Sequence, residues 1–245
     1  MNITKYIPNA LTLLNLLSGL LALISVFNGF YDHAFTFVCL GIFFDFWDGF
    51  FARKFNVQSD LGLQLDSLAD MVTSGVVPGL MMFKLFENIQ MNQSAYMLTE
   101  DTYYMGVVPY LGFLITLSSC YRLAHFNVDP RQSTSFIGLP TPANALLIMS
   151  IPMIQYFDRF QGLTDLLDNP YILLGITVLS TYLLNAEIPL FSLKFKKLTW
   201  ADAKLQILFL AYSVILLAVW QFVAIPVIIF SYILVSLVLK AVDKP

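Results

Sequence analysis

The sequence predicts an all-α protein that crosses a membrane several times. Charged side chains make up 12% of the 245 residues, against roughly a quarter in soluble globular proteins. Hydrophobic residues make up 58%, and the mean hydropathy is +0.74. Apolar stretches long enough, or nearly long enough, to cross a hydrocarbon core recur along the whole chain. Together these observations predict a polytopic membrane helical bundle that forms a single integral-membrane domain over residues 1–245.

About eight transmembrane helices are expected from these stretches. Pro8 suits the first turn of the first helix, because a first turn leaves its backbone N–H groups without intrahelical partners. The last two stretches are separated by so few residues that they must form a tight hairpin. The expected spans are 8–27, 34–55, 61–86, 105–126, 141–157, 171–185, 204–220 and 222–240.

The basic residues predict the orientation of the bundle. With the amino terminus in the cytoplasm, the cytoplasmic segments hold most of the lysines and arginines, including Lys5, Arg53, Arg122 and Lys240. The opposite side holds few, of which Lys84 is one. Because Lys and Arg are enriched on the cytoplasmic side of membrane proteins, we expect both termini in the cytoplasm. The expected location is the cell (inner or cytoplasmic) membrane.

Composition also argues against some kinds of site. The chain has 13 Lys and Arg against 16 Asp and Glu, so it offers no basic footprint for nucleic acid. Cys39 and Cys120 both lie inside apolar runs. We interpret them as small hydrophobic residues and not as a disulfide or as metal ligands.

Four aspartates lie inside the second and third expected spans: Asp45, Asp48, Asp66 and Asp70. Each carboxylate at the centre of a bilayer costs about 2.5–3.5 kcal/mol, so these side chains must face a polar interior. Asp45 and Asp48 are spaced i, i+3, and Asp66 and Asp70 are spaced i, i+4, so each pair lines one face of its helix. The short link at 54–60 makes the two helices antiparallel and brings the pairs to matching depths.

Converging carboxylates repel each other unless cations lie between them. Hard oxygen ligands without histidine or thiolate favour Mg²⁺ or Mn²⁺ over zinc or copper. Gly49 and Gly62 lie beside these aspartates, where they either allow a bulky ligand to approach the backbone or allow close helix packing. Arg53, one turn after Gly49, suits either a phosphate or an orienting role at the membrane surface.

These residues form the pattern D-x2-D-G-x2-A-R-x8-G-x3-D-x3-D over residues 45–70, with Ala52 at its fourth fixed position. This pattern resembles the signature of the CDP-alcohol phosphatidyltransferases. The resemblance implies an enzyme that transfers a phosphatidyl group from a CDP-lipid to an alcohol at a site with two divalent ions, and that releases CMP. It also implies a homodimer, a catalytic six-helix core at about 1–190 and two additional C-terminal helices at about 204–240.

The resemblance assigns roles residue by residue. Asp45, Asp48 and Asp66 match metal-binding aspartates, and Asp70 matches the fourth, which is both near the metal and the base on the acceptor hydroxyl. Asp48, Gly49, Ala52, Arg53 and Gly62 match positions that bind the CDP-lipid. Asn9, Thr12 and Asn15 recur at i, i+3 at the entry to the first span. They serve either helix capping and interhelical hydrogen bonds or contact with the nucleotide, and Asn15 is our candidate for CDP-lipid binding.

Two further stretches narrow the acceptor. Tyr121–Asn127 contains R-L-A-H-F-N, and F-I-G-L-P-T-P-A follows at 136–143. These resemble the membrane-spanning phosphatidylserine synthases of the family, which transfer the phosphatidyl group of CDP-diacylglycerol to L-serine, except that His125 stands where a second arginine is usual. In this interpretation Arg122 binds the carboxylate of serine, and Asn127 and His125 complete its pocket. Arg122 as a flanking charge and Asn127 as a helix cap are the alternatives.

Other functions stay open at this point. The same chemistry could use glycerol 3-phosphate or an inositol phosphate as the acceptor, although a phosphorylated acceptor needs more basic residues than this region offers. Intramembrane aspartates also occur in divalent-cation transporters. For a transporter we expect acidic residues in spans from both halves of the chain. Here the acidic residues within spans cluster in the second and third, which argues against a transporter.

Overall fold

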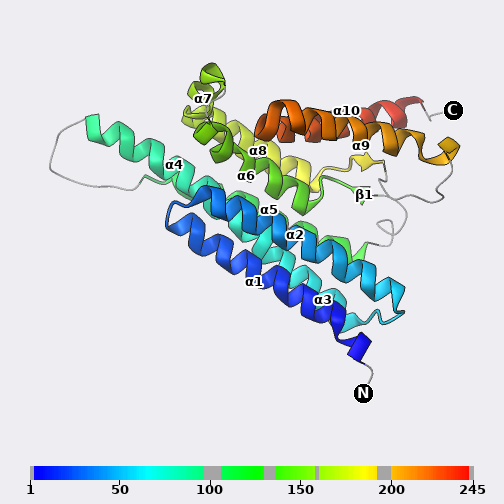
Figure 1. The fold of residues 1–245 in the computed structure, drawn as a ribbon. Coiled ribbons are helices and arrows are strands. Elements are labelled where there is room, and N and C mark those ends of the chain that lie inside the picture. The colour runs from blue at the N-terminus through cyan, green and yellow to red at the C-terminus, as the bar shows by residue number, and fades with distance from the viewer. Residues whose placement is uncertain (1–2, 97–105, 130–135, 158–159, 192–199, 243–245) are drawn as a thin grey trace.

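The computed structural model of this chain describes residues 3–96, 106–129, 136–157, 160–191 and 200–242. A 3-10 turn, η1 (Ile3–Lys5), leads into α1 (Ile7–Phe27), which has Pro8 in its first turn as expected. The next helix, α2 (Tyr31–Lys54), returns antiparallel to α1, and α3 (Asp60–Asp70) runs back beside α1. These three helices form one side of the bundle (Figure 1).

The third span is continuous but not regular. A π-helical segment, η2 (Met71–Val76), joins α3 to α4 (Val77–Tyr96). Together they form a long apolar helix that includes Asp60–Met91. The turn between α2 and α3 matches the link predicted at 54–60, and the Ser59 hydroxyl caps α3 by accepting a hydrogen bond from the Gly62 backbone N–H at 3.1 Å.

The second half of the chain supplies the other side of the bundle. A 3-10 segment, η3 (Val108–Phe113), leads into α5 (Leu114–Val128), and α6 (Thr141–Phe157), a short α7 (Gln161–Leu167) and α8 (Pro170–Asn185) follow. The two-residue strands β1 (Phe136–Ile137) and β2 (Pro189–Leu190) pair antiparallel. The last two helices, α9 (Trp200–Trp220) and α10 (Ala224–Val242), are joined by the 3-10 turn η5 (Gln221–Val223) and form the predicted hairpin.

Two apolar clusters hold the bundle together. The larger one joins α1, α2 and α4 to α5, α6 and α8, and Met81, Ile115 and Ile148 are fully buried in it. The smaller one packs α10 against α6, α8 and β2 through residues such as Ile229 and Leu147. The Tyr232 hydroxyl strengthens this contact by donating a hydrogen bond to the Phe191 carbonyl at 2.6 Å.

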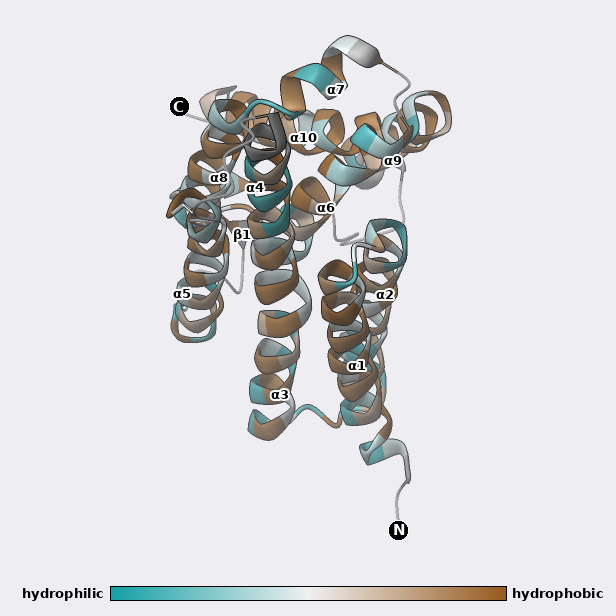
Figure 2. Cartoon of the chain, turned by 90° about the vertical axis from the view of Figure 1, so that its left-hand side faces the viewer, coloured by the Kyte–Doolittle hydropathy of each residue, from teal (hydrophilic) through white to brown (hydrophobic). Residues whose placement is uncertain are grey.

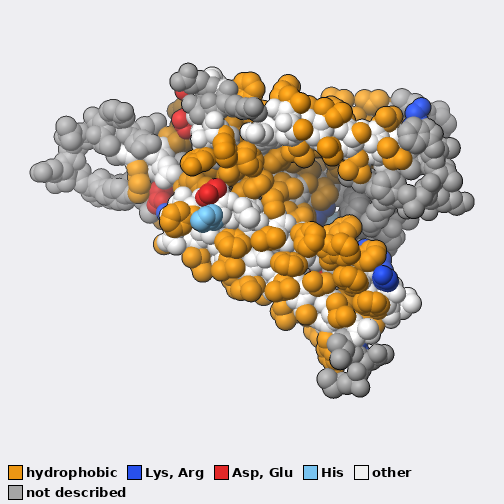
Figure 3. Space-filling view, viewed as in Figure 1, with side chains coloured by type: hydrophobic (Ala, Val, Ile, Leu, Met, Phe, Trp, Pro, Cys, Tyr) orange, Lys and Arg blue, Asp and Glu red, His pale blue; other side chains and the backbone are white. Residues whose placement is uncertain are grey.

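The surface matches a membrane environment. Hydrophobic residues extend along most helices, and hydrophilic ones gather at helix ends and on α7 (Figure 2). Hydrophobic side chains also cover much of the face that α1, α2 and α10 present in Figure 3. Among the described residues, four helical stretches are long and apolar enough to cross a membrane: Ile7–Phe27, Tyr31–Lys54, Asp60–Met91 and Lys204–Ala241.

The predicted all-α membrane bundle is therefore confirmed. Each expected span corresponds to a helix, and η5 makes the turn between the last two. α6 has the bounds expected for its span, and α8 begins one residue earlier than expected. α5 is shorter than its expected span, because the 3-10 segment η3 precedes it. The π-helical segment, α7 and the β1–β2 pair were not expected from the sequence.

Candidate active site

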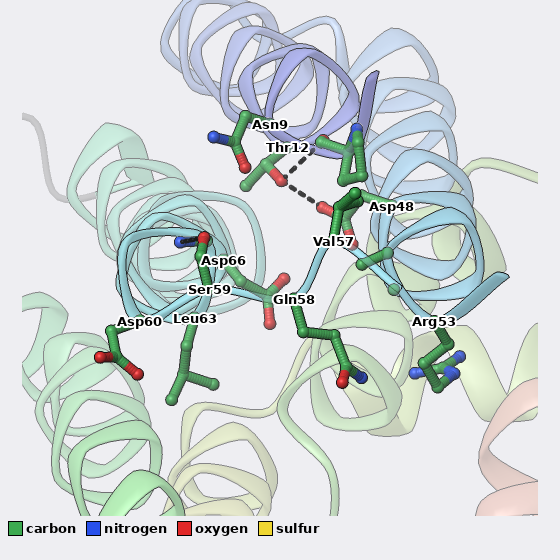
Figure 4. Close-up of a pocket in the computed structure, with 14 residues that line it drawn as sticks. Asn9, Thr12, Asp48, Arg53, Val57, Gln58, Ser59, Asp60, Leu63 and Asp66 are labelled. Atoms are coloured by element: carbon green, nitrogen blue, oxygen red, sulfur yellow. Dashed lines mark hydrogen bonds between the residues drawn. The ribbon is translucent and has the colours of Figure 1, made fainter. Parts of the chain in front are cut away.

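A cavity of about 390 Å³ opens between the start of α1, the end of α2 and the start of α3. Asp48 of α2 and Asp66 of α3 both line this cavity. Figure 4 shows these two side chains from neighbouring helices, with Thr12 of α1 next to Asp48 and Arg53 at the end of α2. The volume lies within the range of about 300–1,000 Å³ that is typical of ligand pockets.

The five residues that the sequence assigns to CDP-lipid binding by the motif all line this cavity: Asp48, Gly49, Ala52, Arg53 and Gly62. The two glycines keep it open. A Cβ atom at Gly49 would lie 3.3 Å from Nη1 of Arg53, and one at Gly62 would lie 3.3 Å from Oγ of Ser59. Either side chain would therefore crowd a polar group on the cavity wall.

Several lining residues were not predicted as site residues. Asn9 and Thr12, for which nucleotide contact was one of two alternatives, both line the cavity. The turn between α2 and α3 adds Gln58, Ser59 and Asp60, which the sequence analysis did not single out. A signal for this turn was present, because a serine three residues before Gly62 is a typical helix N-cap.

Three of the four aspartates form one cluster. Carboxylate oxygens of Asp45, Asp48 and Asp66 all lie within 4.8 Å of one another. The Thr12 hydroxyl donates a hydrogen bond to Oδ2 of Asp48, which is 5% exposed. Oδ1 of Asp66 is buried and has no hydrogen-bond partner among the residues that the structure describes. Three carboxylates at this separation repel each other by roughly 1–4 kcal/mol per pair when each is charged.

Asp70 lies outside this cluster of described carboxylates. Its Oδ1 accepts a hydrogen bond from Nδ2 of Asn15 at 3.1 Å, and it interacts electrostatically with Asp66 and Arg122. Asn15 is fully buried against α3 and is not among the described residues that line the cavity. The structure thus places Asn15 behind the described part of the cavity, in contact with Asp70. This position differs from the CDP-lipid contact that the sequence predicts for Asn15.

The three candidates for serine binding all lie near the end of α5, and none lines the described part of the cavity. Arg122 is 7% exposed, and its Nε has no hydrogen-bond partner within the described ranges. Asn127 donates a hydrogen bond to the Ser67 hydroxyl at 2.8 Å, which ties α5 to the helix that carries Asp66. His125 is exposed and lies 4.0 Å from Asp129.

The aspartate cluster fits a divalent cation. All of its donors are carboxylate oxygens, which Mg²⁺ and Mn²⁺ prefer. The unpartnered oxygen of Asp66 supports this fit, because a buried polar atom without a partner is costly unless a ligand satisfies it. Asp45, Asp48 and Asp66 are thus the residues that the structure brings together for metal binding, and the geometry does not distinguish Mg²⁺ from Mn²⁺.

Comparison with known proteins supports the same chemistry. The family model for CDP-alcohol phosphatidyltransferase matches residues 5–181. The CDP-diacylglycerol–serine O-phosphatidyltransferase of Bacillus subtilis is 37% identical over 56% of this chain and 70% of its own length. The Helicobacter pylori enzyme of the same name is 30% identical over 84% of this chain and 78% of its own length. An archaetidylserine synthase of Methanothermobacter thermautotrophicus is 28% identical over 72% of this chain and 68% of its own.

Proposed function

Because this chain belongs to the CDP-alcohol phosphatidyltransferase family, we propose that it transfers the phosphatidyl group of CDP-diacylglycerol to L-serine. The products are phosphatidylserine and CMP, and the role is phospholipid biosynthesis. The observation that carries the proposal is the cluster of Asp45, Asp48 and Asp66 beside a cavity lined by the rest of the motif. Relatives named for serine as the acceptor support this choice of alcohol.

The cavity holds the CDP part of the lipid in this proposal. Gly49, Ala52 and Gly62 leave room for a bulky ligand close to the backbone, and Arg53 supplies a guanidinium for a phosphate. Asp45, Asp48 and Asp66 hold two divalent cations, Mg²⁺ or Mn²⁺, and Asp70 is a further ligand. When bound, these cations neutralise charge on the pyrophosphate oxygens.

Asp70 takes the proton of the acceptor in this proposal. The hydroxyl oxygen of serine forms a bond to the phosphatidyl phosphorus as its proton passes to the Asp70 carboxylate. The bond from that phosphorus to the oxygen of CMP breaks, and CMP leaves with the electron pair. A positioned carboxylate of this kind contributes typically 10²–10⁴-fold to the rate. The hydrogen bond that Asp70 accepts from the buried Asn15 supports a fixed orientation of the carboxylate toward the site.

Arg122 binds the carboxylate of serine in this proposal. Its buried, unpartnered Nε and its electrostatic interaction with Asp70 support this role, because the guanidinium lies near the proposed base and still has a donor to offer. Asn127 uses Nδ2 to bind Ser67, so its carbonyl oxygen is the atom that accepts from the serine ammonium. His125 completes the pocket as a hydrogen-bonding group.

The proposal extends to the surroundings of the enzyme. The charge distribution of the sequence supports an active site that faces the cytoplasm in a multi-pass protein of the cell (inner or cytoplasmic) membrane. The family resemblance supports a homodimer. The family model ends at residue 181, which supports a catalytic core at about 1–190 with α9 and α10 as additional helices.

An acceptor panel tests the proposal. Purified protein with Mn²⁺ or Mg²⁺ is incubated with CDP-diacylglycerol, and CMP release is measured with L-serine, glycerol 3-phosphate, inositol phosphate or no acceptor. We expect release with L-serine alone, and none after chelation of the metal. Release driven equally well by glycerol 3-phosphate would reassign the acceptor. Uptake of Mn²⁺ into liposomes without any CDP-lipid would favour a transporter instead.

A further inference from the structure

The π-helical segment η2 begins directly after Asp70, the proposed base. A π turn contains an extra residue, so it shifts the side chains that follow it onto a different face from that of a regular α-helix. Such segments occur frequently at functional sites. Here η2 buries Thr73 completely, and Thr73 lies three residues after Asp70 on the side that meets α1.

Thr73 fits between two glycines on different helices. A Cβ atom at Gly19 of α1 would overlap with the Thr73 hydroxyl, and one at Gly41 of α2 would lie 2.6 Å from the Thr73 methyl group. A side chain at either glycine would therefore displace Thr73. The three helical segments approach each other this closely only because both positions lack a side chain.

Hydrogen bonds connect Thr73 to Asp70 through Asn15. The Thr73 hydroxyl donates to the backbone carbonyl of Asn15 at 3.1 Å, and Nδ2 of Asn15 donates to Oδ1 of Asp70 at 3.1 Å. Asn15 and Thr73 are both fully buried. The carboxylate fixes the orientation of the Asn15 amide, because an amide oxygen turned toward Asp70 would meet a second acceptor.

We propose that Asn15 and Thr73 are positioning residues that hold the Asp70 carboxylate in its catalytic orientation, with Gly19 and Gly41 providing the space for Thr73. The inference rests on the proposed function of Asp70 as the base. Asp70 also has an attractive electrostatic interaction with Arg122 of α5. The hydrogen bond from Asn15 holds the carboxylate from the α1 side. A misplacement of about 1 Å between reacting groups can cost on the order of 10²-fold in rate.

The steady-state kinetics of purified variants test this role. We expect Asn15→Ala to lower kcat about 100-fold and Thr73→Val about tenfold, with KM for CDP-diacylglycerol and serine within about twofold of wild type. Thr73→Ser keeps the hydroxyl and is expected to stay within about threefold of the wild-type kcat. Thr177→Val is the matched control, because Thr177 is equally buried but donates to Leu173 in its own helix at 2.8 Å.

Two readouts separate positioning from a loss of structure. CDP binding measured by calorimetry is expected to stay within about twofold of wild type, and melting temperatures of the Thr73 variants are expected to match that of Thr177→Val. In an Asp70→Asn background, Asn15→Ala is expected to cause less than about threefold further loss, because a residue that acts through Asp70 has nothing left to position.

The outcomes are distinguishable from those of the proposed function. Asp70→Asn without activity, combined with a wild-type kcat in Asn15→Ala, overturns the positioning role alone. So does a raised KM for CDP-diacylglycerol in Asn15→Ala with unchanged kcat, which would return Asn15 to lipid binding. A Thr73→Ser variant as impaired as Thr73→Val also overturns it. Near-wild-type activity in Asp70→Asn overturns the role of Asp70 as the base and this inference with it.

Discussion

Asp48 is the least exposed of the four aspartates, and its surroundings show how a membrane protein retains a charge inside a helix. The Thr12 hydroxyl satisfies one oxygen, and the cavity gives the carboxylate access to a ligand. Without such partners, a carboxylate at this depth would cost several kcal/mol. The burial of Asp48 is therefore consistent with a site that is complete only with its cation.

Replacement of Asp48 by asparagine tests that interpretation. Asp48→Asn keeps the size of the side chain and still accepts from Thr12, but it removes one negative charge from the cluster. We expect Mn²⁺ binding at least about tenfold weaker and CMP release lower by about 10² or more, as measured by calorimetry and a coupled assay. Asp32→Asn, at the exposed start of the same helix, is the control and is expected to change neither.

Arg122 is the residue that decides the acceptor in our proposal. Arg122→Lys keeps a positive charge but loses the planar pair of donors that binds a carboxylate in two places. We expect the KM for L-serine to rise about tenfold, while the KM for CDP-diacylglycerol stays unchanged. Equal changes in both constants would assign Arg122 a structural role and remove it from the serine pocket.

At the level of helices and turns, the sequence predicted the elements that depend on local patterns. The α2–α3 turn lies at the predicted link, since α2 ends at Lys54 and α3 begins at Asp60. A link this short makes the two helices antiparallel, as predicted. The π segment was not predictable in the same way. Its Thr73 makes tertiary contacts, with a hydrogen bond to Asn15, 58 residues away, and close packing against Gly41. Neither contact leaves a periodic signal in the sequence.

At the candidate site, too, local sequence patterns were predictable and tertiary contacts were not. The spacing of the motif predicted part of the cavity lining, because Gly49, Ala52 and Arg53 recur on one helix face. It was not sufficient to predict that Asn15 contacts Asp70 behind the cavity. Spacing i, i+3 in a first helix shows only that residues share a face, whereas their partners depend on how α3 packs against that face.

The segment before α6 depends on a glycine at position 138. Gly138 has φ of +75°, and an added Cβ would lie 2.6 Å from the Leu184 carbonyl oxygen. The neighbouring Leu139 N–H donates to Leu183 at 2.8 Å, so the segment is held against the end of α8. The structure therefore shows a rigid connection between α6 and α8 at this point.

We expect Gly138→Ala to destabilise the protein by about 1–3 kcal/mol, seen as a lower melting temperature in detergent. Two controls separate the causes. Gly29→Ala has a similar φ of +78° with nothing within 4 Å of its Cβ, so it measures the backbone cost alone. Gly175→Ala lies in α8 with open space and is expected to raise stability by roughly 0.5–1 kcal/mol. Equal losses at Gly138 and Gly29 would show that the close contact with Leu184 contributes nothing.

For the whole molecule, the arrangement of the helices places all of the described cluster residues at one end of the bundle. The cavity lies where α2 ends and α3 begins, and the hairpin of α9 and α10 packs on the opposite side from α1 and α3 (Figure 1). A water-soluble acceptor must reach this end, so the orientation of the bundle decides from which compartment the enzyme takes its substrate.

Reporter fusions measure that orientation. With both termini in the cytoplasm, a fluorescent protein fused at the C-terminus is expected to fluoresce, and alkaline phosphatase fused there is expected to be inactive in a bacterial host. The reverse is expected for fusions after Asp168, in the loop between α7 and α8, which lies on the other side if α6 and α8 each cross the membrane once. The basic residues at the end of α2 favour this result, because Arg53 lines the cavity and Lys54 follows it in the last turn of the helix. Active phosphatase at the C-terminus would place the active site outside the cytoplasm, where CDP-diacylglycerol would have to be supplied from the opposite leaflet.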